Sequence, residues 1–253
     1  MVFMRFLPGI LKELTRHVPT VLFNSVDWNE LASELPQISR RMIQKEGYKK
    51  LYNHQKDLLS SLPIELSLEK IKYPQILEKK KAGDLVLTLY FLQIFSQEGL
   101  FLDLRSYHFG QDEDKLLWHP SPLWTNFNEK FRTGLLKVYE GFYLENDGAY
   151  FEGLEDLGLI KKSFTLDEKN ELGNLFRSHF GTALNKEMAF KLSHLQESII
   201  KMSDFFLTKK VKISKDFLYL GIYLVTLYST LDEWGEEHMV KQIYLDVRKK
   251  LQR

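Results

Sequence analysis

Two histidines and two aspartates lie close together in the middle of this sequence. His108 and His119 stand on either side of a polar turn at residues 110–114, with Asp103 and Asp112 nearby. If the flanking segments pair as a hairpin, the imidazoles approach each other, and neutral imidazoles with a carboxylate can bind a divalent metal. The alternative is that both are turn histidines that only hydrogen-bond the surrounding backbone.

Three aromatic side chains accompany this group and suggest a ligand-binding surface. Tyr107 precedes the first histidine, Trp118 precedes the second, and Trp124 follows two prolines. Large aromatic side chains serve either core packing or a ligand groove. The candidate ligand-binding residues are Asp103, Tyr107, His108, Trp118, His119 and Trp124. We assign no catalytic residue, metal ligand or cofactor from this pattern.

Other catalytic and metal-binding patterns do not occur in the sequence. A carboxylate-bridged metal centre in a helical bundle needs glutamate three residues before histidine. None of the seven histidines has that neighbour: Phe176 precedes His179, and Lys191 precedes His194. We expect these two histidines to be hydrogen-bonded core or surface residues. No phosphate-binding loop or nucleophile motif is present either, so we do not expect an enzyme.

The elements that must position the candidate residues are an apolar helix and a hairpin. Residues 85–95 contain only two polar side chains, which predicts a central helix that ends near Glu98, before Gly99. Alternating apolar and polar residues over 100–109 predict a half-buried strand, and 116–118 its return strand. No other segment has a strand pattern.

Apolar residues recur every three or four positions through the second half of the chain, which predicts a series of amphipathic helices. Asn126 or Asn128 caps the first of them, and Gly158 ends the next. Thr165 and Glu168 have the spacing of a capping box. The remaining predicted helices span residues 185–208, 214–234 and 236–251. We therefore expect a mainly α fold, a helical bundle with one short β-hairpin insert.

The order of these segments resembles the C-terminal lobe of the UbiB (AarF) family of atypical kinases. Residues 91–95 and 99–101 look like the helix that leads into that family's catalytic loop. The helices after that family's metal-binding D-F-G motif are similar to residues 131–136, Asp147 and residues 154–160. The family's late C-lobe pattern is similar to residues 213–217 and 231–232. The similarity covers residues 82–232 and implies a kinase-like C-terminal lobe.

The residues that perform phosphoryl transfer in that family have no match in this chain. Residues 102–109 stand in place of its H-A-D-P-H-P-G-N loop, but Asp103 is one position out of register and no asparagine follows. Trp118 and His119 stand where D-F-G would fall, without a carboxylate for magnesium. The phosphate loop, strand lysine and K-x-G-Q motif are also missing, and phosphoryl transfer depends on such groups. The resemblance therefore implies a degenerate, non-catalytic relative.

Composition narrows the range of partners. With 253 residues, 44% of them hydrophobic, the chain can bury a substantial core. Its 35 basic and 34 acidic residues leave a net charge of +1, and we see no basic stripe, so we expect no nucleic-acid partner. The lack of cysteine fits a reducing compartment, and we expect a cytoplasmic protein.

No run of the sequence reaches the roughly 20 apolar residues that a membrane-spanning helix needs. Residues 4–23, bounded by Met4 and Phe23, mix apolar and basic side chains. This pattern favours a helix packed on its own domain, and the alternative is peripheral contact with a membrane interface. We expect an N-terminal helical segment at 1–62 and a kinase-like helical domain at 63–253, unless the two form one continuous domain.

The sequence thus predicts a non-catalytic, degenerate UbiB-like protein that binds a hydrophobic small molecule or a protein partner through residues 102–124. The family's link to isoprenoid quinone metabolism implies a lipid or a membrane-associated partner. Two alternatives remain open: a metal-dependent enzyme with its site at the 102–124 hairpin, and a peripheral membrane-associated helical protein.

Overall fold

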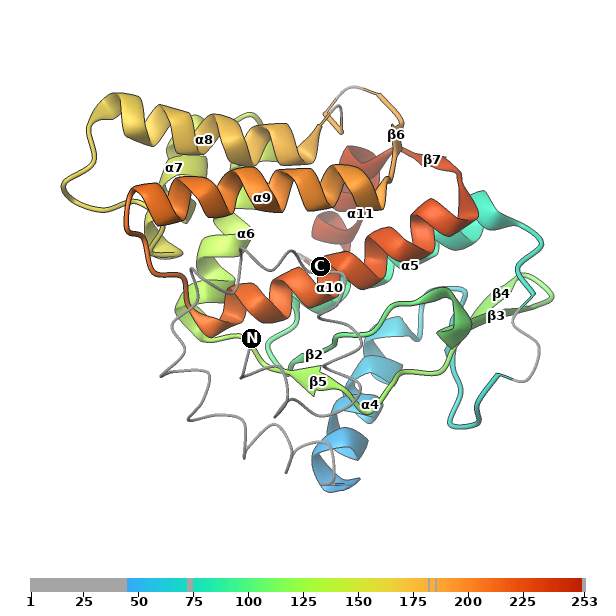
Figure 1. Ribbon diagram of the computed structural model, residues 1–253. Coiled ribbons are helices and arrows are strands. Elements are labelled where there is room, and N and C mark those ends of the chain that lie inside the picture. The colour runs from blue at the N-terminus through green and yellow to red at the C-terminus, as the bar shows by residue number, and fades with distance from the viewer. Residues whose placement is uncertain (1–44, 72–74, 182, 185, 252–253) are drawn as a thin grey trace, which may run out of the picture.

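The computed structural model describes residues 45–71, 75–181, 183–184 and 186–251. This part of the chain contains eight α-helices and only short strands, so the prediction of a mainly α fold is confirmed (Figure 1). The helices are α4 (Lys45–Leu59), α5 (Lys79–Phe95), α6 (Glu129–Tyr143), α7 (Asp147–Asp156), α8 (Leu166–Phe180), α9 (Leu192–Thr208), α10 (Lys215–Trp234) and α11 (Val240–Leu251).

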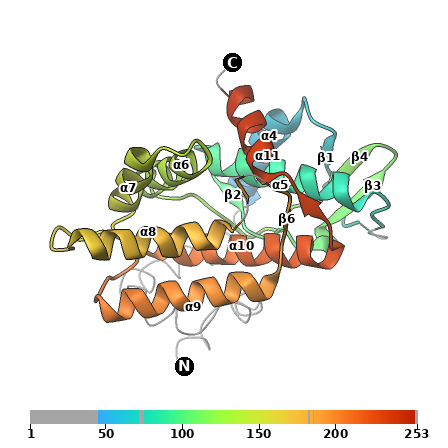
Figure 2. The same ribbon diagram turned by 90° about the horizontal axis from the view of Figure 1, so that it is seen from above.

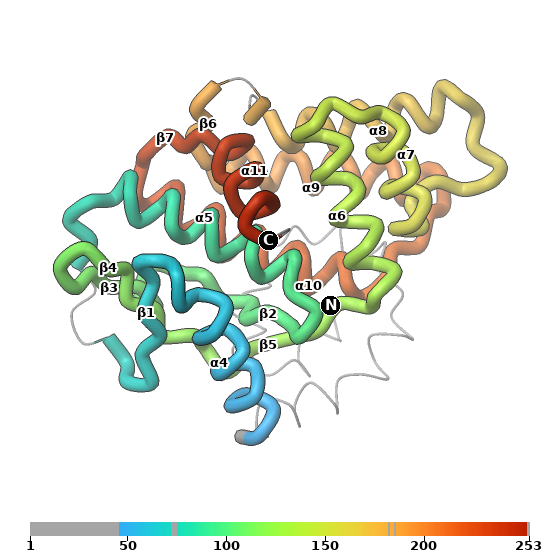
Figure 3. The backbone as a smooth tube through the Cα atoms, turned by 180° about the vertical axis from the view of Figure 1, so that it is seen from behind, coloured from blue at the N-terminus to red at the C-terminus, as the bar shows by residue number. Residues whose placement is uncertain are grey.

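Helices α5 and α10 pack against each other at the centre of the molecule (Figures 1 and 2). Helix α11 packs on α5, as Figure 3 shows from behind, and α9 packs on both α8 and α10. Fifteen of the twenty residues of α10 are buried, and α5 is buried on nearly all sides, which the apolar composition of both helices requires. The predicted central helix at 85–95 is therefore confirmed. It begins earlier, at Lys79, and ends at Phe95 because Ser96 is extended.

Local capping signals position several helix ends as predicted. The side chain of Asn128 accepts a hydrogen bond from the backbone amide of Lys130 and caps α6. Thr165 and Glu168 form the capping box that starts α8. Gly158 follows the end of α7 with a φ of 74°, which glycine adopts without the strain that a Cβ would cause.

The strands form three small sheets, whose pairing is set by tertiary contacts. Strands β1 (Ile64–Leu66), β4 (Lys115–Trp118) and β3 (Phe109–Asp112) lie in that order, with β1 parallel and β3 antiparallel to β4. The other two sheets each contain two antiparallel strands: β2 (Leu100–Phe101) with β5 (Trp124–Thr125), and β6 (Met188–Ala189) with β7 (Glu237–His238).

The prediction of a single hairpin was partly wrong. The return strand is correct, but its partner is β3 at 109–112, rather than a strand over 100–109. The strand pair of β6 and β7 also replaces the first turns of the two helices predicted at 185–208 and 236–251. Because strands of two residues carry no detectable periodicity, sequence patterns could not reveal them.

Helix α4 shares the hydrophobic core of the rest of the described chain. Leu51 is buried in this core, the hydroxyl of Tyr52 donates to the carbonyl of Leu66, and Gln55 donates to the carbonyl of Gly99. These contacts cross the predicted boundary after residue 62. Residues 4–23, predicted to form a helix packed on its own domain or, alternatively, one in contact with a membrane interface, lie outside the described residues. None of the described helices is both long and apolar enough to cross a bilayer.

Candidate functional site

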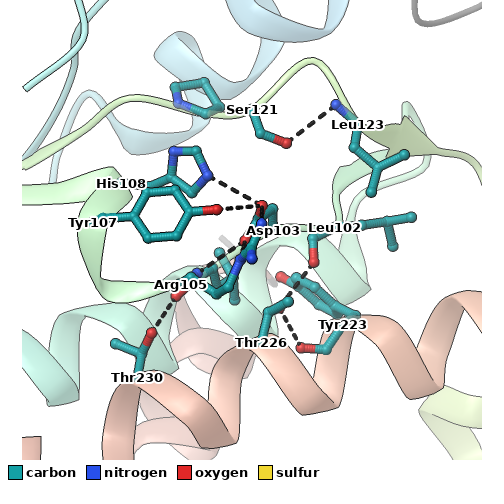
Figure 4. Close-up of polar contacts among 12 residues, drawn as sticks. Leu102, Asp103, Arg105, Tyr107, His108, Ser121, Leu123, Tyr223, Thr226 and Thr230 are labelled. Carbon is teal, nitrogen blue, oxygen red and sulfur yellow. Dashed lines mark hydrogen bonds and ion pairs between the residues drawn. The ribbon is translucent and has the colours of Figure 1, made fainter. Parts of the chain in front are cut away.

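The segment that carries Asp103 is held against α10 by two threonines. The hydroxyl of Thr226 donates to the carbonyl of Leu102 at 2.9 Å, and that of Thr230 donates to the carbonyl of Leu104 at 2.6 Å (Figure 4). Both leucines are fully buried. Beyond strand β2, the alternation that predicted a strand therefore reflects an extended segment. Its carbonyls at Leu102 and Leu104 accept from side chains of α10, and the amide of Leu102 donates to the carbonyl of Leu123.

Asp103 lies at the centre of a group of polar side chains and is itself inaccessible to solvent. Nε and Nη2 of Arg105 donate to its two carboxylate oxygens at 2.8 and 2.7 Å. Nε2 of His108 lies 3.1 Å from Oδ2, and the hydroxyl of Tyr107 lies 3.5 Å from the same oxygen (Figure 4). Arg105 also stacks on the Tyr107 ring. The carboxylate is surrounded by donors.

The surroundings of Asp103 keep it ionised. Burial by itself would raise the pKa of this carboxyl, but the hydrogen bonds from Arg105 and the adjacent His108 lower it to about 2. A carboxylate with so low a pKa and so many donors is a weak proton acceptor, because proton transfer to it would break these contacts. The arrangement suits a structural anion better than a general base.

The two predicted histidines are near neighbours, as the hairpin hypothesis required. The ring centres of His108 and His119 are 6.4 Å apart, and the backbone amide of His119 donates to the carbonyl of His108. Nδ1 of His119 lies 3.0 Å from the carbonyl oxygen of Ser67. Asp112 is exposed at the far end of β3. Within the described ranges, no group of three or more histidine, aspartate or glutamate side chains is placed to hold a metal ion.

The two tryptophans of the predicted set occupy different environments from this polar group. Trp118 has no exposed surface and packs against the rings of Phe101 and Phe109, so its position is that of a core residue. Trp124 is half-buried and lies against Gly47 of α4, where a Cβ would come within 2.8 Å of its ring. Of the six candidates, the structure thus gathers Asp103, Tyr107, His108 and His119.

No family model and no curated protein matches this chain. The resemblance to the UbiB kinases accordingly rests on the sequence segments themselves.

A second candidate site lies in the helical half of the molecule, where the sequence reasoning did not place one. Helices α6, α8, α9 and α10 line a partly open cavity of about 70 Å³. Its lining is almost entirely apolar and comprises Leu135, Val138, Tyr139, Leu157, Phe176, His179, Phe180, Ile199, Met202, Phe206, Phe217, Leu220, Gly221 and Leu224. No charged side chain is among them. The cavity can therefore accept an apolar group.

His179 is the one imidazole in this lining and is almost completely buried. Its Nδ1 lies 3.1 Å from the hydroxyl of Ser198 on α9, and its ring stacks on Tyr228 of α10. Burial, with a smaller effect of His194, lowers the pKa of His179 to about 4, so the ring is neutral at pH 7. The expectation of a hydrogen-bonded core histidine is met for His179, whereas His194 is exposed.

A sequence signal for this second site did exist. His179 falls on the apolar stripe of α8, seven residues after Leu172 and three after Phe176. A histidine at such a position must face the interior of the bundle. What the spacing could not show is that four helices leave space beside it, because packing gaps depend on how helices from distant parts of the chain meet.

Proposed function

We propose that this chain is a non-catalytic binding protein that holds an apolar small molecule in the cavity between α6, α8, α9 and α10. The observation that carries the proposal is the apolar lining of this cavity. The Tyr139 hydroxyl is already paired with that of Tyr90, and the His179 Nδ1 with Ser198. Such a site, apolar with few polar groups, is typical of small-molecule pockets.

The energetics of the cavity favour an occupant. A ligand that covers the apolar lining removes that surface from water, which contributes about 25 cal/mol per Å² of buried apolar area. An apolar group of matching shape also gains dispersion contacts with the lining. A volume of about 70 Å³ holds a short alkyl segment or part of a ring, and because the cavity is partly open the remainder of a larger ligand extends out of it.

We further propose that the chain is a degenerate relative of the UbiB kinases. The order of elements supports this: α5 leads into the Asp103 loop, the hairpin of β3 and β4 follows, and a helical half comes after it. The paired, solvent-inaccessible Asp103 and the histidine at position 119 support the absence of phosphoryl transfer. That reaction relies on accessible carboxylates that hold metal and orient the nucleophile.

The test uses a polyprenyl-quinone analogue and Nile red as apolar probes of the full-length protein. Ligands that bind only the native state raise its Tm. We expect both probes to bind, and we expect the Ile199→Phe variant, which fills the cavity, to weaken binding at least about tenfold, since the lining can no longer enclose the ligand. Ile200→Phe is the matched control, because the neighbouring residue is exposed rather than part of the lining.

Two results would contradict the proposal. If neither probe binds, or if Ile199→Phe and Ile200→Phe bind equally well, the cavity is not the site, and a protein partner becomes the better hypothesis. A clear rise in Tm with ATP and magnesium would contradict the non-catalytic part, because a nucleotide site would then have survived.

A further inference from the structure

Among the side chains that line the cavity, His179 has a ring nitrogen that makes no hydrogen bond to the described part of the chain. Nδ1 of His179 is engaged by Ser198, and no other hydrogen bond to this ring is formed within the described part of the chain. A neutral imidazole carries one donor and one acceptor nitrogen, so Nε2 keeps one hydrogen-bonding position unused. The hydroxyl of Tyr139, the other polar side chain of the lining, is bonded to Tyr90.

His179 also lies in the wall between two cavities. A smaller cavity of about 30 Å³, lined by Tyr90, Tyr228 and Val240 among others, shares four side chains with the first. The shared side chains are Tyr139, His179, Phe180 and Leu224. A ligand in the larger cavity therefore lies beside the imidazole, and its other neighbours in the lining include apolar groups such as Met202 and Phe206.

The charge of the site discriminates between kinds of polar group. The lining of either cavity contains no lysine or arginine, and burial lowers the pKa of His179 to about 4. A carboxylate or phosphate inside the cavity would be desolvated without a counter-charge, which disfavours its binding. A hydroxyl or a carbonyl loses far less on desolvation and recovers it by one hydrogen bond.

We infer that the occupant of the cavity is a small apolar molecule with a single uncharged hydroxyl or carbonyl group, which hydrogen-bonds to Nε2 of His179. This inference rests on the function proposed above and adds the chemical class of the ligand.

The experiment compares three ligands that share one ring and differ in one substituent: toluene, para-cresol and para-toluate. Their Kd values are measured on the full-length protein at pH 7.5 by ligand-observed NMR. We expect para-cresol to bind about fivefold more tightly than toluene, as one neutral hydrogen bond provides. We expect para-toluate to bind at least about tenfold more weakly than toluene, since its carboxylate remains unpaired.

Two variants connect this preference to the imidazole. His179→Phe keeps a ring of similar size without a hydrogen-bonding atom, so toluene should bind as before and the advantage of para-cresol should disappear. His179→Gln keeps a donor and an acceptor, so part of that advantage should remain. The wild-type ratios stand as a test by themselves even if a variant does not fold.

The outcomes separate this inference from the function on which it rests. If toluene binds and para-cresol or para-toluate binds equally well, the ligand class is wrong and the apolar cavity remains the site. If the advantage of para-cresol survives in His179→Phe, the imidazole is not its partner and the inference is overturned. If none of the three compounds binds the wild-type protein, both the inference and the proposed function fail.

Discussion

Asp103 and Arg105, two residues apart, form a paired contact in which both carboxylate oxygens of the aspartate accept from the guanidinium. The aspartate side chain is completely buried, and that of Arg105 is 15% exposed. Removing one partner of a buried pair leaves the other charge without compensation. We expect Asp103→Asn to lower the free energy of unfolding by roughly 3 kcal/mol at pH 7, measured by urea denaturation. Asp114→Asn, at a position where the side chain is 92% exposed, should change it by less than about 0.5 kcal/mol.

The same pair predicts an acid dependence of stability. The pKa of Asp103 is lowered from 3.8 to about 2 in the folded protein, so the unfolded state binds a proton first as the pH falls. The stabilisation is fully present above about pH 4 and is lost as the pH falls to 2. It amounts to roughly 2.5 kcal/mol, because each pKa unit corresponds to about 1.4 kcal/mol. An equal loss of stability between pH 4 and 2 in wild type and Asp103→Asn would contradict this assignment.

The hydroxyl of Thr230 should be needed to hold the loop that contains Asp103. Thr230→Val preserves the shape of the side chain but leaves the buried carbonyl of Leu104 without its donor. We expect a loss of about 1–2 kcal/mol in the free energy of unfolding, measured by urea denaturation. The control Thr208→Val, at an exposed residue, should be within about 0.5 kcal/mol of wild type. Equal effects of the two substitutions would show that the loop is held by other contacts.

The buried His179 should make stability sensitive to mildly acidic pH. Because burial lowers its pKa from 6.5 to about 4, the unfolded state binds more protons than the folded state between these values. Stability should therefore be complete above pH 6.5 and fall by roughly 3 kcal/mol as the pH decreases to 4. His179→Gln should flatten the curve of unfolding free energy against pH in this window. His194→Gln should leave most of this slope. If the slope instead disappears in His194→Gln, the assignment of the pH dependence to His179 is wrong.

The contact between α6 and α7 should tolerate alanine at one helical glycine and not at another. A Cβ at Gly141 would lie 2.3 Å from the backbone nitrogen of Tyr150, whereas one at Gly148 would meet only the side-chain oxygen of Asn146 at 3.4 Å. Neither glycine has a positive φ. We expect Gly141→Ala to lower the Tm and destabilise the protein by about 1–3 kcal/mol, as overpacking does.

Gly148→Ala is the matched control for this contact. It should be neutral or stabilise the protein by up to about 1 kcal/mol, because alanine is the better helix former. A Gly141→Ala variant with the Tm of wild type would show that α6 and α7 can move apart at little cost.

Much of the helical framework could be predicted from the sequence. The apolar run at 85–95, the Asn128 cap and the Thr165 capping box are local signals, and each was found where expected. Such signals are reliable because hydrogen bonds and side-chain contacts within one helix join residues a few positions apart. The proximity of His108 to His119 was also predictable, since a hairpin brings its two strands together.

Only the tertiary structure decided which of these residues are available for binding. The sequence could not show that Trp118 belongs to the core, or that the segment at 102–105 bonds to threonines of α10, more than 120 positions later in the chain. The sequence did determine that α8 carries a histidine on its apolar stripe, because the helical period alone places His179 there. The cavity beside His179 arises where four helices from separate parts of the chain meet, and the volume left there depends on their relative placement.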